Sequence, residues 1–408
     1  MIDCGVEAVP HLVEYCQAEK LSRFLLIADD NTYDILGWQV VAALKDQGWD
    51  VKTVVLSGSV VADERYLVEV LLHAGNKERT YLSVGSGTIT DIARFTSHRT
   101  RNRFISLPTA PSVDGYTSEN APLVIRGYKR SYRAHAPEAV FADLKTLCEA
   151  PPSMIAAGFG DMLGKYTALA DWKLGQLLWG EEFRPDLEAR VRKALAECVK
   201  CLPEIRKASR EGICCLMLGL AETGACITEF GDSRPAAGLE HLLSHFWEMK
   251  LLREGRPPVL HGAKVGVATL LEAEMYERLR SMSKDEALRR LETGARPDYD
   301  AQVAKIERVY GPIAGEIVRD QRPFLDMSVD RSKQIKADIL AHWDEVQAAA
   351  ATVPSAEQLA KWLHAAGGPA TPEALGLAPA EVDLAMSAAH FLRARFNVWK
   401  LGQALGMW

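Results

Sequence analysis

The sequence lacks several features that would place it in a specialised class of protein. No apolar run approaches the roughly 20 residues of a membrane-spanning helix, and the first residues lack the basic stretch and apolar core of a signal peptide. Basic residues are not in excess, because 48 Lys and Arg stand against 54 Asp and Glu, for a net charge of -6. A nucleic-acid partner would need a basic face to neutralise phosphates. These absences predict a soluble, cytoplasmic protein with no membrane or nucleic-acid partner.

Cysteine is also too sparse to form a framework of disulfides or metal ligands. The chain has eight cysteines in 408 residues, and most of them stand in apolar helical surroundings, where they are expected to be small core residues. Cys198 and Cys201 form a CxxC pair, but no second such pair occurs. The pair therefore predicts neither a zinc site nor a redox site.

What is present is a change of pattern near residue 148. Before it, apolar strands alternate with helices of 10–15 residues, which predicts βαβ units and a parallel sheet. After it, amphipathic helices follow one another without a strand signal. At 408 residues two domains are expected. We predict a Rossmann-like α/β domain over residues 1–148 and an all-α helical domain over 149–408. The strands are expected at about 23–29, 49–56, 80–84, 103–107 and 139–142.

Three polar turns follow predicted strands and should meet at one edge of the sheet. Gly85-Ser-Gly87 leads into a helix whose amino-terminal N–H groups can bind an anion. A loop over residues 108–118 follows the next strand, and Asp29 ends the first one, where an acid can bind an adenosine ribose. Each turn taken alone is ordinary loop chemistry. Together they favour a nucleotide site.

Three of the ten histidines fall within 21 residues. His241 and His245 are four apart and share one helix face, while His261 follows a Pro-Pro break. Imidazoles from two elements can converge on a metal ion. On spacing alone, a pair of hydrogen-bonded helix histidines and an unrelated turn histidine explain the pattern equally well. Leu242 excludes the zinc-protease motif, because it cannot act as a general base.

A third candidate ligand is Asp161, in a helix lined by Ala, Gly and Met. A buried carboxylate there is costly unless it is paired or bound to a metal. Gly158, Gly160 and Gly164 weaken that helix, which indicates close approach of another group. The simpler alternative is an ion pair between Asp161 and Lys165, four residues on.

Five motifs in this order carry a family resemblance: GSGTITDI, PTAPSVDGYTS, GFGDMLGK, GLEHLLSHFWEM and LHGAKVGV. The series resembles the superfamily of metal-dependent polyol dehydrogenases and dehydroquinate-synthase-like enzymes, and within it the bacterial sn-glycerol-1-phosphate dehydrogenases. It extends over nearly the whole chain. One departure is Leu239, which replaces a small polar residue beside a metal ligand and puts the polarity around that ligand in doubt.

The resemblance implies a role for each matching residue. Asp161, His241 and His261 would bind the metal, and Asp114, His245 and Asp161 would contact substrate and act in catalysis. NAD, with NADP as the alternative, would be held by Asp29, Gly85, Gly87, Thr88, Ile89, Thr90, Asp91, Thr109, Ala110, Pro111, Ser112 and Ser118. Asp29 favours NAD, because a carboxylate repels a 2′-phosphate.

The implied reaction is metal-dependent reduction of dihydroxyacetone phosphate to sn-glycerol 1-phosphate, and its reverse. His245 is the expected proton carrier, since an unperturbed imidazole has a pKa of about 6.5. The divalent ion would be zinc or nickel, with iron as another option, and a homodimer is expected. For the substrate phosphate we favour Lys165, and we interpret the basic run Arg126, Lys129, Arg130 and Arg133 as a surface segment. Alternatives are a sugar-phosphate cyclase like dehydroquinate synthase, or a glycerol or polyol dehydrogenase acting on an unphosphorylated substrate.

Overall fold

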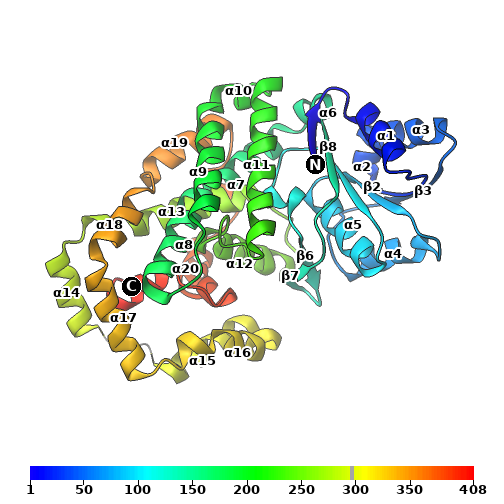
Figure 1. Ribbon diagram of the computed structural model, residues 1–408. Helices are drawn as coiled ribbons and strands as arrows, with labels where there is room; N and C mark the ends of the chain where they lie inside the picture. Colours follow the sequence, from blue (N-terminus) through cyan, green and yellow to red (C-terminus); the bar gives the residue numbers. More distant parts are fainter. Residues whose placement is uncertain (295–297) are drawn as a thin grey trace.

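In the computed structural model, which describes residues 1–294 and 298–408, the first half of the chain is built around one parallel sheet (Figure 1). Its strand order is β1-β8-β5-β4-β2-β3, and every neighbouring pair is parallel. The strands are β1 (Ile2–Gly5), β2 (Arg23–Asp29), β3 (Asp50–Leu56), β4 (Thr80–Gly85), β5 (Phe104–Pro108) and β8 (Ala139–Asp143). The five predicted strands are thus confirmed, and β1 is an additional strand that was not predicted.

Both faces of this sheet are covered by helices, which explains the nearly continuous apolar character of its strands. In β2 the side chains of Phe24, Leu26 and Ala28 pack toward one face, and Leu25 and Ile27 toward the other. This alternation is the two-residue period of a strand. Helices α1 (Ala8–Ala18) and α3 (Trp38–Asp46) cover the first face, and α4 (Glu64–Ala74) and α5 (Gly87–Arg99) cover the second.

An antiparallel hairpin, absent from the sequence prediction, interrupts the βα pattern. It consists of β6 (Asn120–Ile125) and β7 (Tyr128–Arg133), which pair in a separate sheet. The turn contains Arg126 and Gly127, both with positive φ, a conformation that glycine adopts readily. The basic run that we interpreted as a surface segment therefore lies in this hairpin, with Arg126 in the turn and Lys129, Arg130 and Arg133 in β7.

In the described parts of residues 144–408, all regular secondary structure is helical. These are α6 (Leu144–Cys148), α7 (Pro152–Leu163), α8 (Lys165–Trp179), α9 (Pro185–Lys200), α10 (Leu202–Arg206), α11 (Arg210–Phe230), α12 (Leu239–Arg253), α13 (His261–Ser281), α14 (Lys284–Thr293), α15 (Tyr299–Tyr310), α16 (Ala314–Leu325), α17 (Val329–Ala341), α18 (Trp343–Ala351), α19 (Ala356–Ala366), α20 (Pro379–Ala388) and α21 (Val398–Ala404). An all-helical second part of the chain is as predicted, and Gly164 separates α7 from α8.

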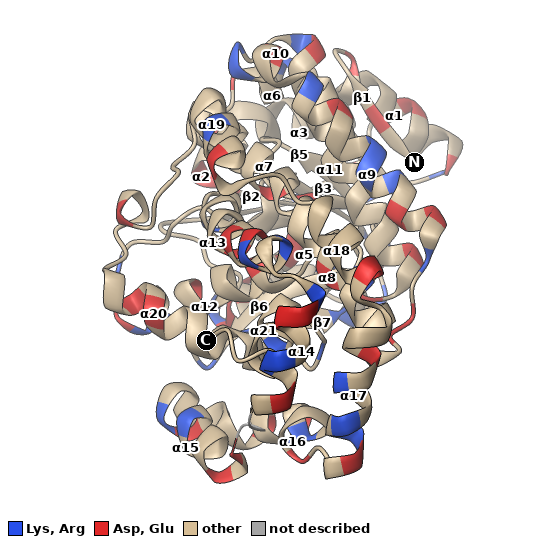
Figure 2. Ribbon diagram, turned by 90° about the vertical axis from the view of Figure 1, so that its left-hand side faces the viewer, with Lys and Arg blue, Asp and Glu red and all other residues tan. Residues whose placement is uncertain are grey.

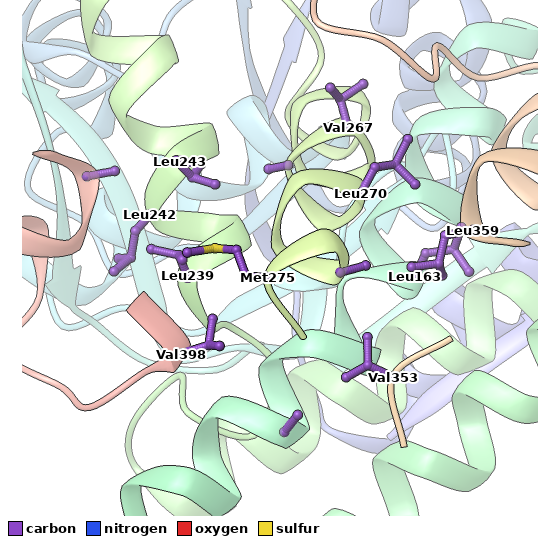
Figure 3. Close-up of a cluster of buried hydrophobic side chains, with 14 of the residues drawn as sticks. Leu163, Leu239, Leu242, Leu243, Val267, Leu270, Met275, Val353, Leu359 and Val398 are labelled. Atoms are coloured by element: carbon purple, nitrogen blue, oxygen red, sulfur yellow. The ribbon is translucent and has the colours of Figure 1, made fainter. Parts of the chain in front are cut away.

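The core of the helical half surrounds α12 and α13. Figure 3 shows side chains of α12, such as Leu242 and Leu243, together with Val267 and Leu270 of α13 and Leu163 of α7. The same cluster of buried residues reaches Val140 and Ala142 of β8. One hydrophobic core therefore continues across the predicted boundary at residue 148, and the division into two domains stays a prediction. On the outer helices, such as α14, α16 and α17, basic and acidic residues are mixed (Figure 2).

Helix α11 corrects the expectation that no apolar run approaches membrane length. Its 21 residues are long and apolar enough to cross a membrane by length and composition, and 56% of the apolar window is buried inside the protein. Ile213, Leu216 and Leu220 of this helix belong to the main hydrophobic core. Packing within the protein therefore explains its apolar composition.

Candidate functional site

The site begins where α7 crosses α13 at very short range. A Cβ atom added to Gly262 of α13 would overlap the carbonyl oxygen of Ala157, and one added to Gly160 of α7 would overlap the carbonyl oxygen of Gly262. Gly158 similarly accommodates the carbonyl oxygen of Pro111. The close approach inferred from these glycines is thus confirmed, and it brings Asp161 of α7 beside His261, the first residue of α13.

Asp161, His241 and His261 converge as the metal-site hypothesis requires. Each offers one ligand atom, and the three atoms lie within 4.8 Å of one another. The rings of His241 and His261 have centroids 5.3 Å apart, and His241 Nε2 lies 3.4 Å from Asp161 Oδ1. One carboxylate and two imidazoles suit a divalent transition metal and leave coordination positions open.

The protonation of these groups fits metal binding. Burial of the His261 imidazole lowers its pKa to about 3, so its nitrogen lone pair is available at neutral pH. The pKa of Asp161 is lowered even though burial opposes this, because Lys165 and His241 stabilise its carboxylate. His241 differs: burial and Lys165 act to lower its pKa, but Asp161 and Glu240 outweigh them and raise it to about 9. A metal ion must therefore displace a proton from His241.

Glu240 fixes the orientation of His241. Its Oε1 lies 2.6 Å from His241 Nδ1 and also accepts the backbone N–H of Gly238, while Oε2 accepts the hydroxyl of Thr167. The pKa of Glu240 is lowered despite burial, chiefly by His241, so its carboxylate is an acceptor and Nδ1 must be the donor. Nε2 is then the nitrogen that faces Asp161. A carboxylate behind a ligating histidine is the usual device for fixing its tautomer.

Lys165 binds two carboxylates of the protein, whereas we expected it to bind the substrate phosphate. Its ammonium group is fully buried and donates to Asp114 Oδ2 at 2.7 Å, Asp161 Oδ1 at 3.0 Å and the Ala236 carbonyl oxygen at 3.1 Å. An ammonium has three N–H donors, so none is free for a substrate phosphate. The ion pair with Asp161, proposed as the simpler alternative, is present together with the metal-site geometry. A second contact joins Asp161 to Asp114, whose backbone N–H donates to Asp161 Oδ2.

His245 lies one turn beyond His241 on α12, with its ring 5.4 Å from that of His261. Its Nδ1 is buried and has no hydrogen-bond partner among the residues that the structure describes. Burial, together with Lys129 and His261, lowers the pKa of His245 well below the ordinary value of 6.5. Its imidazole is therefore neutral at pH 7, whereas an unperturbed histidine would be partly protonated.

His241, His245, His261 and Asp114 line a large cleft with a volume of about 640 Å³. The predicted residues that line it are Gly87, Thr88, Asp91, Ser112, Asp114, Ser118, His241, His245 and His261. The cleft thus connects the start of α5, the loop after β5 and the histidines of α12 and α13. Its volume lies within the range of small-molecule and cofactor sites.

Other predicted cofactor residues do not line this cleft: Asp29, Gly85, Ile89, Thr90, Thr109, Ala110 and Pro111. Asp29 caps the short helix α2 (Asp30–Thr32), because its Oδ1 accepts the backbone N–H of Thr32. Gly85 ends β4 and packs against Ile89. Asp91 lines the cleft but also pairs with Arg94 at 2.8 Å, and burial raises the pKa of Asp91 to about 7.

Sequence reasoning missed several residues of the site. Glu240 lies in the motif GLEHLLSHFWEM, directly before His241. A carboxylate next to a candidate metal ligand could have indicated its role. Glu248 lies one turn beyond His245 and pairs with Lys129 at 2.7 Å and Lys264 at 3.1 Å. It forms a second group of potential ligands with His245 and His261, but both ammonium groups already neutralise its carboxylate. Arg393, to which no role was assigned from the sequence, also lines the cleft.

Comparison with known proteins agrees with this geometry. A family model described as iron-containing alcohol dehydrogenase matches residues 3–151. The chain is 37% identical to a protein of Geobacillus thermodenitrificans named glycerol-1-phosphate dehydrogenase (NAD(P)+), across 95% of this chain and 88% of that one. It is 36% identical to the protein of that name from Bacillus subtilis, across 96% and 88%.

Solved structures share the fold at low sequence identity. Glycerol dehydrogenase from Schizosaccharomyces pombe has a TM-score of 0.61 at 14% identity, covering 100% of this chain and 88% of that one. A 2-deoxy-scyllo-inosose synthase, complexed with carbaglucose-6-phosphate, NAD+ and Co2+, has a TM-score of 0.52 at 15% identity, across 70% and 76%. The relatives at 36–37% identity are decisive: the chain belongs to the glycerol-1-phosphate dehydrogenase family, among the iron-containing alcohol dehydrogenases.

Proposed function

We propose that the protein is an NAD(P)-dependent, divalent-metal-dependent dehydrogenase that interconverts dihydroxyacetone phosphate and sn-glycerol 1-phosphate. The observation that carries the proposal is the convergence of Asp161, His241 and His261 at a cleft that also contains the start of α5. The curated relatives bear the name of this activity. We further propose that it works in the cytoplasm as a homodimer.

Asp161, His241 and His261 would hold the metal ion, which is zinc or nickel in our proposal, with iron as the alternative. A bound divalent ion supplies Lewis acidity toward the C2 oxygen of the substrate. Glu240 keeps His241 Nε2 directed at the ion, and Lys165 holds Asp161 and Asp114 in place. These contacts are made before substrate arrives, so the ligands are preorganised.

The nicotinamide cofactor would deliver hydride to C2, and the C2 oxygen then needs a proton. His245 and Asp114 are the proposed groups that contact substrate, since both line the cleft beside the metal ligands. A neutral His245 can donate an N–H hydrogen bond to the oxygen while a proton arrives through bound water. Asp114 has its pKa raised by burial and by Asp161, and Lys165 opposes this rise.

For the cofactor, we propose that residues 85–91 at the start of α5 bind the pyrophosphate. The residues from Thr109 to Ser112, with Ser118, would contact the nicotinamide side. Free N–H groups at a helix amino terminus favour an anion there. Asp29, at the end of β2, would bind the adenosine ribose and favour NAD over NADP.

The test is NADH oxidation by metal-reconstituted protein, with dihydroxyacetone phosphate and, in parallel, unphosphorylated dihydroxyacetone. Oxidation with the phosphorylated ketone alone, giving a product that a stereospecific assay identifies as sn-glycerol 1-phosphate, supports the proposal. Oxidation with both ketones indicates a general polyol dehydrogenase. No oxidation with either, at full metal occupancy, overturns the proposal and directs attention to cyclase substrates.

A further inference from the structure

The cleft contains an arginine whose charge no carboxylate neutralises. Four cationic side chains line this cleft, namely Lys129, Arg133, Arg393 and Arg395. Lys129 pairs with Glu248 at 2.7 Å, and Arg133, whose side chain is 80% exposed, pairs with Glu119 at 3.4 Å. Arg395 donates to the Ala237 carbonyl oxygen, the Ser233 hydroxyl and Asp232. Within the described part of the chain, only Arg393 of these four has no carboxylate within 4.0 Å.

Arg393 has spare hydrogen-bonding capacity as well as spare charge. It follows the short helix η5 (Ala389–Leu392) in an extended conformation, and one Nη2 hydrogen bond to Ser131 Oγ, at 3.0 Å, accounts for one of its donors. A guanidinium has five N–H donors in a fork that matches phosphate. Arg393 is exposed and lines the cleft, so an anion that enters the cleft can reach its free N–H donors.

The hairpin presents one face to the same cleft. Alternate residues of β7, namely Lys129, Ser131 and Arg133, line it, as do their cross-strand partners Val124, Pro122 and Asn120. Lys129 contacts Glu248 on α12, one turn beyond His245. Ser131 lies two residues, or about 7 Å, further along the strand. The contact between Ser131 and Arg393 therefore lies in the same cleft as the histidines, on the wall formed by the hairpin.

We propose that Arg393, together with the Ser131 hydroxyl, forms the subsite for the phosphate group of the substrate. This inference rests on the proposed function and deepens it. Arg393 would bind two phosphate oxygens with parallel N–H donors, while Ser131 donates its hydroxyl hydrogen. Arg395 is a positioning residue, because its contact with the Ala237 carbonyl oxygen at 2.6 Å ties this segment to the loop before α12. Specificity for a phosphorylated ketone then depends on a residue 262 positions away from Ser131 in the chain.

The experiment compares Arg393→Ala, Arg393→Lys and Ser131→Ala with the wild-type holoenzyme. Loss of charge-assisted hydrogen bonds should lower kcat/KM for dihydroxyacetone phosphate on the order of 10- to 100-fold in Arg393→Ala. The lysine variant should retain part of the activity, because it keeps the charge but loses the paired donors. Inorganic phosphate should inhibit the wild type competitively against the ketone, and this inhibition should weaken in Arg393→Ala by a similar factor.

Arg133→Ala is the matched control, since it removes an exposed arginine from the same wall of the cleft. The subsite is overturned if this variant loses phosphate inhibition while Arg393→Ala keeps it. It is also overturned if Arg393→Ala retains wild-type kcat/KM. Bound metal and NADH affinity, measured for every variant, should equal those of the wild type; their loss would mean that Arg393 supports the fold instead of binding phosphate. Failure of the wild type to reduce dihydroxyacetone phosphate would refute the proposed function itself, which is a distinguishable result.

Discussion

Glu272 is expected to hold a proton at neutral pH, and its replacement by Gln should reveal this as a change in pH-dependent stability. Glu272, Asp171 and Glu240 are buried carboxyl groups with oxygens within 4.8 Å of one another. Asp171 accepts the Tyr276 hydroxyl and the backbone N–H groups of Leu239 and Val398. The Glu240 carboxylate also accepts three hydrogen bonds, from His241, Gly238 and Thr167. Among the described residues, Glu272 accepts a hydrogen bond only from the Glu240 N–H, and its Oε1 has no partner. The proton therefore belongs on Glu272.

The pKa of Glu272 is raised well above 4.5, first by burial and then by Asp171 and Glu240. Between 4.5 and the folded-state pKa, the native protein binds more protons than the unfolded chain, so the free energy of unfolding falls as pH rises. Each pH unit in that window costs about 1.4 kcal/mol, or about 3 kcal/mol over two units. The Gln side chain is neutral in both states, so this loss disappears in Glu272→Gln.

The assay is the melting temperature of metal-loaded wild type and Glu272→Gln from pH 5 to pH 8. The variant should gain stability relative to the wild type as pH rises, by several degrees across the range. Effects of pH on the metal ligands act on both proteins and cancel in the difference. Glu274→Gln, at an exposed position on the same helix, should follow the wild type throughout. If the difference in melting temperature between Glu272→Gln and the wild type does not change with pH, the assignment of the proton to Glu272 is refuted.

Three further changes test the site. Glu240→Gln should weaken metal binding by roughly 10- to 100-fold, because His241 loses the carboxylate that orients it; equilibrium dialysis measures this, and unchanged affinity would contradict the role of Glu240. Asp161→Asn should lower both metal content and turnover with little change in far-UV circular dichroism; full metal content with normal activity would refute the ligand assignment. Gly262→Ala should destabilise the protein by about 1–3 kcal/mol or more, since the new methyl group overlaps the Ala157 carbonyl. Its thermal melting and metal content should fall together, and Gly315→Ala, where the added Cβ meets only the end of Arg319, is the control.

The sequence predicted those parts of the molecule that local patterns encode. Five strands follow from apolar runs that end in polar turns, and the histidine spacing on α12 follows from helix periodicity. The order of the five motifs also indicated the family. Glycines at 158, 160 and 164 correctly indicated close approach, although nothing in the sequence named Gly262 as the partner of Gly160.

Features that depend on contacts between distant segments could not be predicted. Strand β1 has four residues and is stabilised by pairing with β8, far along the chain. The hairpin strand β7 is rich in Arg, Lys and Tyr, and a charged run of this kind has the composition of a surface segment. The task of Lys165 became clear only when Asp114, 51 residues away, was seen to share its ammonium group. Glu272 resembles any other acidic residue of a helix until its burial is known.

The arrangement of charges explains why so many ionisable groups can be buried together at this site. Asp114, Asp161 and Lys165 form a connected group with a net charge of -1 when both carboxylates are ionised. A divalent cation on Asp161 would change that net charge to +1, which favours an anionic oxygen on the substrate. With Lys165 absent, the same cation would leave the group neutral and the preference for negative charge would be lost. The buried lysine therefore sets the charge that the substrate oxygen meets, although it has no free donor for the substrate itself.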